Sequence, residues 1–84
     1  DLNNLYPNNR ILIAASYNAG TNRVNQWLYR ANNKLTLDEF VASIPFYETR
    51  DYIQNTIVYD FYYQILQQKE NPQMFSQEEW DRLY

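Results

Sequence analysis

Histidine and cysteine are both absent from the sequence. Their absence excludes a zinc site built from cysteine and histidine, a thiol nucleophile, and any catalytic triad that depends on histidine. The remaining candidates for acid or base chemistry are ten carboxylate residues and nine tyrosines. Their spacing gives no cluster of metal ligands, so we expect neither a metal ion nor an organic cofactor.

Glycine and proline are scarce, with one glycine and three prolines among 84 residues. Few positions therefore suit tight hairpin turns, and the apolar residues recur at spacings of three and four, which is typical of helices. A chain of this length can form at most one small domain. Aromatic residues make up 18% of it, which favours a packed core over disorder. We predict an all-α domain of about five helices.

Long apolar runs and an excess of basic residues are absent as well. No run approaches the roughly 18 residues that a membrane span requires, so we expect no membrane span. The net charge of −3 gives no basic surface for a phosphate backbone, so we expect no nucleic-acid partner. Residues 1–4 do not have the composition of a signal peptide, and we expect the chain to begin as a mature or internal segment.

Capping residues and apolar periodicity place the predicted helices. Asn8 or Asn9 can cap the first helix, and Gly20 can end it in the left-handed conformation. Thr21 is the expected N-cap of the second helix, and Pro45 suits the first position of the longest one. The predicted helices cover about 9–20, 22–31, 37–44, 46–68 and 77–83, and residues 2–9 and 31–34 are expected to be connections.

Two capping boxes support the starts of the two shortest predicted helices. The first is the string TLDE at residues 36–39, which is followed by Phe40. The second is SQEE at residues 76–79, where Phe75 and Trp80 are placed to form a hydrophobic staple across the first turn. In each box the side chains at both ends hydrogen-bond to backbone N–H groups that the helix leaves free.

The longest predicted helix carries apolar side chains at a repeat of four. Ile53, Ile57, Phe61 and Ile65 should form a wide apolar face that packs on the core. Aromatic residues at helical spacing are usually buried, so core packing is the expected role of most remaining aromatic side chains. These residues are Trp27, Tyr59, Phe61, Tyr62, Tyr63 and Trp80.

Spacing alone gives only a weak chemical signal. Glu48 and Tyr52 are four residues apart on one helix, so they share a face and could contact the same ligand. The structural alternative is a solvated carboxylate favoured by the helix dipole. Likewise, Asn18 and Gly20 could do no more than end the first helix. Both readings remain open at this level.

Specific strings carry a family resemblance that spans nearly the whole chain. The first is ASYNAG at residues 15–20, followed by Arg23-Val24 and Trp27-Leu28. The second is Ile44-Pro45-Phe46 joined to Glu48-Thr49-Arg50 and Tyr52, and the third is the tail at residues 59–84. Together they resemble the third motif, the fourth motif and the C-terminal end of the family-1 lytic transglycosylases of the soluble type.

Two departures from the family pattern are small, and one is large. Ser16 stands where alanine is common, and Thr21-Asn22 replaces a frequent Pro-Gly. The Glu-Ser string that holds the family's catalytic glutamate, and its Gly-Leu-Met-Gln string, do not occur in the chain. The resemblance therefore implies that residues 1–84 are the C-terminal part of a single lysozyme-like transglycosylase catalytic domain, without its catalytic residue.

The resemblance implies an enzyme of the Gram-negative periplasm that acts on peptidoglycan. Such enzymes cleave the β-1,4 bond between N-acetylmuramic acid and N-acetylglucosamine and release a 1,6-anhydromuramyl product. One glutamic acid makes both proton transfers, and it lies upstream of this chain, so we expect the chain alone to be inactive. The motif match assigns substrate contacts to Tyr17, Asn18, Glu48 and Tyr52. It assigns supporting positions to Ala15, Gly20 and Arg50.

The expected partners are peptidoglycan glycan strands and the N-terminal part of the same protein. We also expect the isolated segment to self-associate through an exposed face that includes Leu12, Ala15 and the long helix. One alternative is a glycan-binding helical module without turnover. Another is a protein-interaction module without sugar contacts, which predicts an open surface with no groove between Tyr17 and Glu48.

Overall fold

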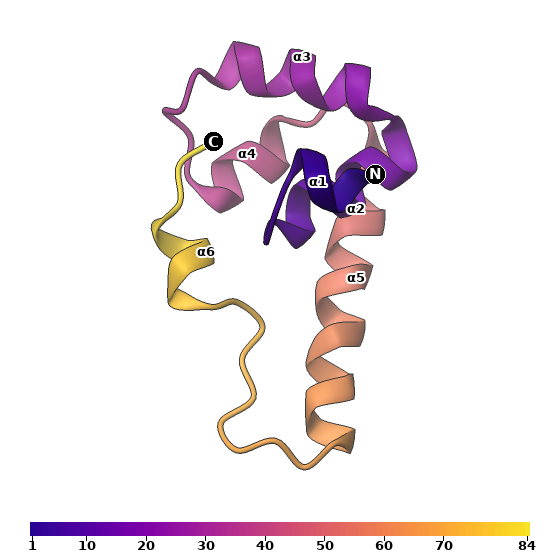
Figure 1. Ribbon diagram of the computed structural model, residues 1–84, viewed down its shortest axis with the longest axis vertical. Coiled ribbons are helices and arrows are strands. Elements are labelled where there is room, and N and C mark those ends of the chain that lie inside the picture. The colour runs from indigo at the N-terminus through magenta and orange to yellow at the C-terminus, as the bar shows by residue number, and fades with distance from the viewer.

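The computed structural model describes all 84 residues as six helices without strands, and the all-α prediction is confirmed (Figure 1). The helices are α1 Leu2–Leu5, α2 Arg10–Ala19, α3 Thr21–Ala31, α4 Leu37–Ser43, α5 Tyr47–Leu66 and α6 Gln77–Asp81. Helix α2 lies between α3 and α5 and packs against both. It is therefore the central element of the fold.

Helix α1 occupies a stretch that the sequence predicted to be a connection. Its four residues are too few to show an apolar repeat, and none of them is buried. The helix is held at its start by Asp1, whose carboxylate accepts a hydrogen bond from the Asn4 N–H at 2.9 Å. The missed signal is this aspartate cap.

The boundary between α2 and α3 agrees with the prediction except in two details. Asn9 caps α2, because its side-chain oxygen accepts a hydrogen bond from the Leu12 N–H at 3.2 Å. Gly20 ends α2 with φ 91° and ψ 151°, which is the mirror image of extended backbone and not the predicted left-handed helical conformation. Gly20 is also the N-cap of α3, so Thr21 is the first helical residue and not the predicted cap.

Both predicted capping boxes are confirmed. In α4, the Thr36 N–H donates to Glu39 Oε1 at 2.9 Å. In α6, the Ser76 N–H donates to Glu79 Oε1 at 2.9 Å, and the Glu79 N–H donates to Ser76 Oγ at 3.1 Å. The predicted staple is also present, since the Phe75 and Trp80 ring centroids are 4.8 Å apart.

Helix α5 begins and ends slightly inside the predicted bounds of 46–68. Phe46 is its N-cap, and Pro45 lies before the helix. The prediction that Pro45 occupies the first helical position is therefore wrong. Ile44 is extended, with ψ 122°, as expected for a residue before proline. The long helix itself, with 20 residues, is confirmed.

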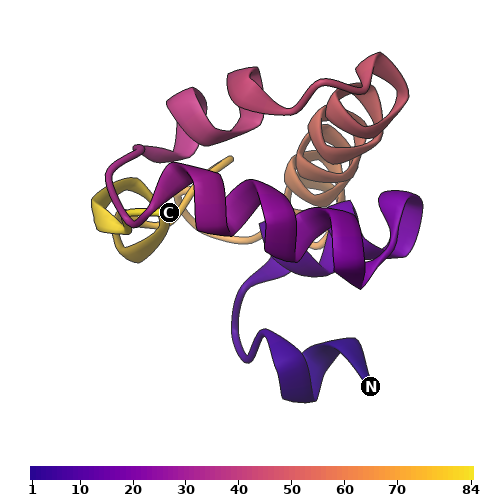
Figure 2. The ribbon, with the colours of Figure 1, turned by 90° about the horizontal axis from the view of Figure 1, so that it is seen from above.

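The core is formed by helices α2 to α4, the first half of α5 and the last residue of the chain (Figures 1 and 2). It contains 13 buried hydrophobic residues: Ile11, Leu12, Ala14, Ala15, Val24, Trp27, Ala31, Leu37, Phe40, Ile44, Ile53, Ile57 and Tyr84. Leu12 and Ala15 are thus buried, and the prediction that they lie on an exposed face is wrong. They contact elements within the chain because α2 is covered by α3 and α5.

The second half of α5 leaves the core, and the prediction that its apolar face is packed is wrong there. Ile53 and Ile57 are buried, whereas the side chains that follow are largely exposed. The exposed residues are Tyr59, Tyr62, Tyr63, Ile65 and Leu66. Helix α2 has ten residues against the 20 of α5, so it covers only the first turns, and Figure 1 shows α5 running on beyond the other helices. Of the two tryptophans, Trp27 is buried as predicted and Trp80 is half exposed.

The C-terminal segment returns along the molecule and is held to α2 and α5 by Arg10. The Arg10 Nε donates to Glu79 Oε2 at 2.6 Å, and its Nη2 donates to Glu79 Oε1 at 3.0 Å and to the Met74 carbonyl. Its Nη1 reaches Asp60 Oδ2 on α5 at 3.1 Å. Burial alone raises the pKa of Glu79, but hydrogen bonds from Arg10 and Ser76 and the Arg10 charge hold it below its ordinary value of 4.5.

The last residue of the chain, Tyr84, is buried in the core. Tyr84 exchanges two backbone hydrogen bonds with Leu35, at 2.8 and 3.2 Å, and its ring stacks on Phe40 with centroids 4.9 Å apart. Burial is the main cause that raises the pKa of the Tyr84 hydroxyl above its ordinary value of 10.0. The C-terminal segment is therefore anchored to the core through Tyr84, with Phe75 packed partly against it.

Replacement of Ser16 by alanine is expected to stabilise the protein by about 1 kcal/mol. Ser16 is 5% exposed, and its hydroxyl has no hydrogen-bond partner in the chain. Alanine removes this unsatisfied group and also favours the helix. Urea unfolding followed by circular dichroism measures the change. The matched control is Ser43→Ala, whose hydroxyl donates to the Phe40 carbonyl at 2.6 Å and which should give no gain. A loss of stability in Ser16→Ala would show that the hydroxyl is satisfied.

Candidate functional site

Two of the predicted contact residues meet where the end of α2 crosses the start of α5. The rings of Tyr17 and Tyr52 stack with their centroids 6.3 Å apart and their planes 9° from parallel. Tyr17 is 76% exposed, whereas Tyr52 is partly buried beneath it. The phenol of Tyr17 is therefore supported from one side and open to solvent on the other.

The third predicted contact residue is fixed by a buried hydroxyl. Thr49 Oγ1 donates to Asn18 Oδ1 at 2.7 Å, and Thr49 is 1% exposed. The bond uses the carbonyl oxygen of the Asn18 amide, and the NH2 group has no partner within the chain. Asn18 is thus oriented with two donors available for a ligand. Thr49 was not singled out from the sequence, although its place four residues before the buried Ile53 on the same face could have indicated it.

The fourth predicted contact residue, Glu48, lies exposed in the first turn of α5. Its carboxylate makes no hydrogen bond or ion pair within the chain. Because Glu48 and Tyr52 are four residues apart on one helix, they share a face. Tyr17, Asn18, Glu48 and Tyr52 therefore lie around one junction between α2 and α5.

The predicted supporting residues hold neighbouring parts of the structure. Ala15 is fully buried at the packed face of α2, and Gly20 makes the turn into α3. Arg50 donates from Nη1 to the Ile44 carbonyl, and its guanidinium lies 5.8 Å from the centre of the Tyr47 ring. Arg50 is two residues from Tyr52, so it projects from a different face of α5. It thereby fixes the link before α5 and not the Tyr17 side of the junction.

Aromatic contacts that the sequence did not indicate anchor that link to α3. The Arg23 guanidinium lies 4.5 Å from the centre of the Phe46 ring, and the Phe46 and Trp27 rings meet edge to face with centroids 5.7 Å apart. Both partners of Phe46 come from α3. The start of α5, and with it Glu48, is therefore held in place by packing from α3 as well as α2.

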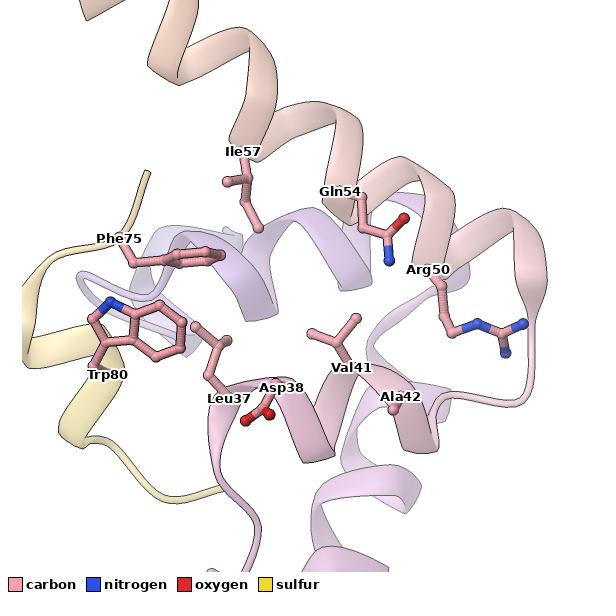
Figure 3. Close-up of a pocket in the computed structure, with 9 residues that line it drawn as sticks. All are labelled: Leu37, Asp38, Val41, Ala42, Arg50, Gln54, Ile57, Phe75 and Trp80. Atoms are coloured by element: carbon pink, nitrogen blue, oxygen red, sulfur yellow. The ribbon is translucent and has the colours of Figure 1, made fainter. Parts of the chain in front are cut away.

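None of the three cavities in the structure is lined by Tyr17, Asn18, Glu48 or Tyr52. These residues form an open surface in this chain, which is the arrangement that the protein-interaction alternative predicts. It is equally the arrangement expected of one wall of a groove. The largest cavity, of about 620 Å³, lies between α4, α5 and the C-terminal segment (Figure 3). Arg50 is the one predicted site residue that lines it.

No group of three or more acidic side chains is arranged to hold a metal ion. No helix combines the length and hydrophobicity that crossing a bilayer requires.

Comparison with protein families matches two parts of the chain to domains of lytic transglycosylases. Residues 1–40 match the transglycosylase SLT domain. Residues 43–72 match the soluble lytic transglycosylase helical domain. The two matched segments share one core here, because α2 from the first packs against α5 from the second.

Three relatives are named as soluble lytic murein transglycosylases. A protein of Haemophilus influenzae named as a soluble lytic murein transglycosylase is 76% identical over 84 residues, which are 100% of this chain and 14% of that protein. The soluble lytic murein transglycosylase of Escherichia coli is 43% identical over 79 residues, covering 94% of this chain and 12% of the relative. An Enterobacter cloacae sequence of the same name is 45% identical over 42 residues, covering 50% of this chain and 98% of that sequence.

A solved structure has the same helical fold. The 70 kDa soluble lytic transglycosylase of Escherichia coli superposes with a TM-score of 0.92 at 41% identity, over 99% of this chain and 13% of that one. The chain belongs to the family of soluble lytic murein transglycosylases. It spans about one seventh or less of the length of the full-size relatives, 14% of the first and 12% of the second.

Proposed function

We propose that the protein containing this segment is a peptidoglycan lytic transglycosylase of the periplasm. It cleaves the β-1,4 bond between N-acetylmuramic acid and N-acetylglucosamine and forms a 1,6-anhydromuramic acid end. The segment supplies one wall of the substrate groove. The glutamate that makes the proton transfers lies upstream, so the segment alone is inactive. The observation that carries this proposal is the junction of Tyr17, Asn18, Glu48 and Tyr52 in a chain of this family.

The reaction needs a single acid that also serves as a base. The acid first protonates the glycosidic oxygen as the bond to C1 breaks. Its carboxylate then takes the proton of the C6 hydroxyl while the C6 oxygen attacks C1. Such a carboxyl must be enclosed by apolar surroundings, which favour its protonated form. Glu48 is exposed in the first turn of α5 and lacks the apolar enclosure that such an acid needs. Glu48 is therefore a substrate contact in this proposal and not the acid.

The junction residues suit complementary parts of a bound glycan. The exposed Tyr17 hydroxyl can hydrogen-bond to the acid or to the sugar at the scissile bond, and its ring is held by Tyr52. The free NH2 group of Asn18 can donate to a carbonyl or hydroxyl of the substrate, while Thr49 prevents the amide from turning. The Glu48 carboxylate can accept from acetamido N–H or hydroxyl groups.

The chain is also proposed to be the C-terminal part of one lysozyme-like catalytic domain that includes all of residues 1–84. Two features support a single unit. Helix α2 packs against α5, and Tyr84 pairs with Leu35 in the core. The proposed partners are glycan strands and the upstream part of the same protein. The exposed second half of α5 suits contact with that part, or with another copy of an isolated segment.

The proposal predicts a graded loss of activity in the full-length protein. Tyr17→Phe should lower kcat/KM about 10- to 100-fold, because it removes one hydrogen bond at the reacting centre and keeps the stack on Tyr52. Glu48→Gln should lower it less than about 10-fold, since an amide still accepts a hydrogen bond. Release of 1,6-anhydromuropeptides from purified peptidoglycan measures both variants.

Tyr29→Phe is the matched control for this experiment. Tyr29 is 89% exposed on α3 and lies outside the junction, so its variant should keep full activity. Equal activity of Tyr17→Phe and Tyr29→Phe would contradict the role of Tyr17. Glycan binding by the full-length protein with no product at all would support the alternative of a non-catalytic binding module.

A further inference from the structure

The largest cavity lies on the opposite side of α5 from the junction residues. Arg50, Gln54 and Ile57 line it from α5 at a spacing that puts them on one face. Glu48 and Tyr52 lie about half a turn around the helix from that face. A sugar residue in this cavity therefore cannot be the one that Tyr17 and Asn18 contact. The cavity belongs to a separate site.

The cavity has an apolar base and an aromatic wall. Figure 3 shows Leu37 and Val41 on α4 facing Ile57 on α5, with Phe75 and Trp80 closing one end. Trp80 is 50% exposed, and its ring is held against Phe75 with centroids 4.8 Å apart. The volume of about 620 Å³ lies within the range of roughly 300–1,000 Å³ that small-molecule sites occupy. An exposed aromatic ring beside an apolar base suits the C–H face of a sugar and a methyl group.

Three polar groups at the cavity have hydrogen-bonding capacity that the protein does not use. The Gln54 amide and the Trp80 Nε1–H have no partner within the chain, and Gln54 points between the two helices in Figure 3. Asp38 accepts one hydrogen bond, from Thr36 at 2.7 Å, and its second carboxylate oxygen is free. The Gln54 amide provides both donors and an acceptor beside the apolar base, and Asp38 adds an acceptor at its outer edge. This combination matches hydroxyl and acetamido groups better than it matches a purely apolar helix.

The charges favour a neutral ligand. Arg50 is the only cation at the cavity, and its guanidinium is engaged by the Ile44 carbonyl and the Tyr47 ring. Figure 3 shows it directed away from the space between the helices. Asp38 adds a negative charge at the rim. A ligand carboxylate, such as the lactyl group of muramic acid, would find repulsion and no free cation.

We propose that this cavity is a second glycan subsite that binds a neutral N-acetylated sugar of the N-acetylglucosamine type. The pyranose ring lies against Trp80, the acetamido group bonds to Gln54, and its methyl group contacts Val41 and Ile57. The inference depends on the proposed peptidoglycan substrate for its biological ligand. The site binds a glycan strand at a distance from the junction where the bond is cleaved. It therefore contributes to substrate binding and not to the chemical step.

Titration of the full-length protein with diacetylchitobiose, followed by methyl NMR, tests this site. The disaccharide contains no muramic acid, so it is not a substrate of the proposed reaction. We expect saturable shifts of the Val41 and Ile57 methyl signals, and at least about fivefold weaker binding of N-acetylmuramic acid. Gln54→Leu should weaken binding of the disaccharide about fivefold, and Trp80→Ala about tenfold.

Two control variants and a turnover assay separate this inference from the proposed function. Gln26→Leu and Tyr29→Ala change exposed residues of α3 outside the cavity and should bind the disaccharide as the parent protein does. The Gln54 side chain is exposed and makes no contact that the fold needs, so the Gln54→Leu variant should fold. Its binding result can therefore be interpreted even if Trp80→Ala does not fold. Absence of shifts at Val41 and Ile57, or their appearance with a helical peptide and not with the sugar, would overturn the inference. Peptidoglycan cleavage in the same preparation would then still uphold the proposed function.

Discussion

Replacement of Phe40 by alanine is expected to lower the free energy of unfolding by about 3–5 kcal/mol. Phe40 is fully buried on α4, and its ring stacks on Tyr84. The substitution leaves a cavity at the point where the end of the chain meets the core. A domain of this size has a net stability of only about 4–13 kcal/mol, so the substitution removes a large fraction of it. Urea unfolding followed by circular dichroism measures the loss.

Two further substitutions make this prediction specific. Phe40→Leu keeps most of the volume and should cost less than about 1.5 kcal/mol beyond the lost ring contact with Tyr84. Tyr29→Ala removes an equally large ring that is 89% exposed, and should change stability by no more than about 0.5 kcal/mol. If Phe40→Ala and Tyr29→Ala had the same midpoint, α4 and the C-terminal residue would not belong to the cooperative core.

Replacement of Arg10 by methionine is expected to cost about 2 kcal/mol and to release the C-terminal segment. Methionine keeps the unbranched apolar stem of the side chain but removes both hydrogen bonds to Glu79, the ion pair with Asp60 and the bond to the Met74 carbonyl. The Glu79 side chain is only 12% exposed, so its charge would be left without a partner in a partly desolvated place. Hydrogen exchange of residues 74–84 and urea unfolding measure the two effects.

The matched control is Arg82→Met, because Arg82 also pairs with a glutamate. Its partner Glu78 is 73% exposed and four residues away on the same helix end, so the loss should be only about 0.3–0.5 kcal/mol. Equal losses in the two variants would mean that the Arg10 contacts add nothing beyond a surface ion pair.

The pH dependence of stability gives an independent measure of the Arg10 contacts. The pKa of Glu79 is lowered in the folded state, so its contribution is present above the ordinary value of 4.5 and is lost as the pH falls through the lower folded value. Arg10→Met should remove this component. Its stability should therefore fall less steeply than that of the parent protein when the pH is lowered below 4.5.

The helices could be predicted from the sequence wherever a local rule determines them. The capping boxes at Thr36 and Ser76, the asparagine cap at Asn9 and the stop at Gly20 each depend on a few neighbouring residues. Helix α1 was missed because four residues carry no periodic signal. The exact conformation of Gly20 was also missed, since it is set by how α2 and α3 are joined and not by glycine itself.

Burial was harder to predict, because an apolar repeat does not reveal which partner covers it. The repeat on α5 continues from Ile53 to Ile65, yet only its first half is covered within this chain. The opposite error occurred on α2, where Leu12 and Ala15 were expected at an exposed face and lie in the core. Both errors have the same cause, since the length and placement of α2 relative to α5 are tertiary properties.

The candidate site came from matched strings, and the structure adds the contacts that join them. Spacing placed Glu48 and Tyr52 on one face, but it could not place Tyr17 against Tyr52 across 35 positions of sequence. Nor could it identify Thr49, whose hydroxyl holds Asn18. The roles of these residues toward a substrate remain predictions, and so does the upstream location of the acid.

Release of 1,6-anhydromuropeptides from purified peptidoglycan, by this chain with and without a separately supplied upstream part of the protein, tests the central claim most directly. The account predicts no product from the 84 residues alone and product after complementation. Product from the 84 residues alone would mean that Glu48 or another carboxylate of this chain is the acid, which contradicts the proposed division of the catalytic site.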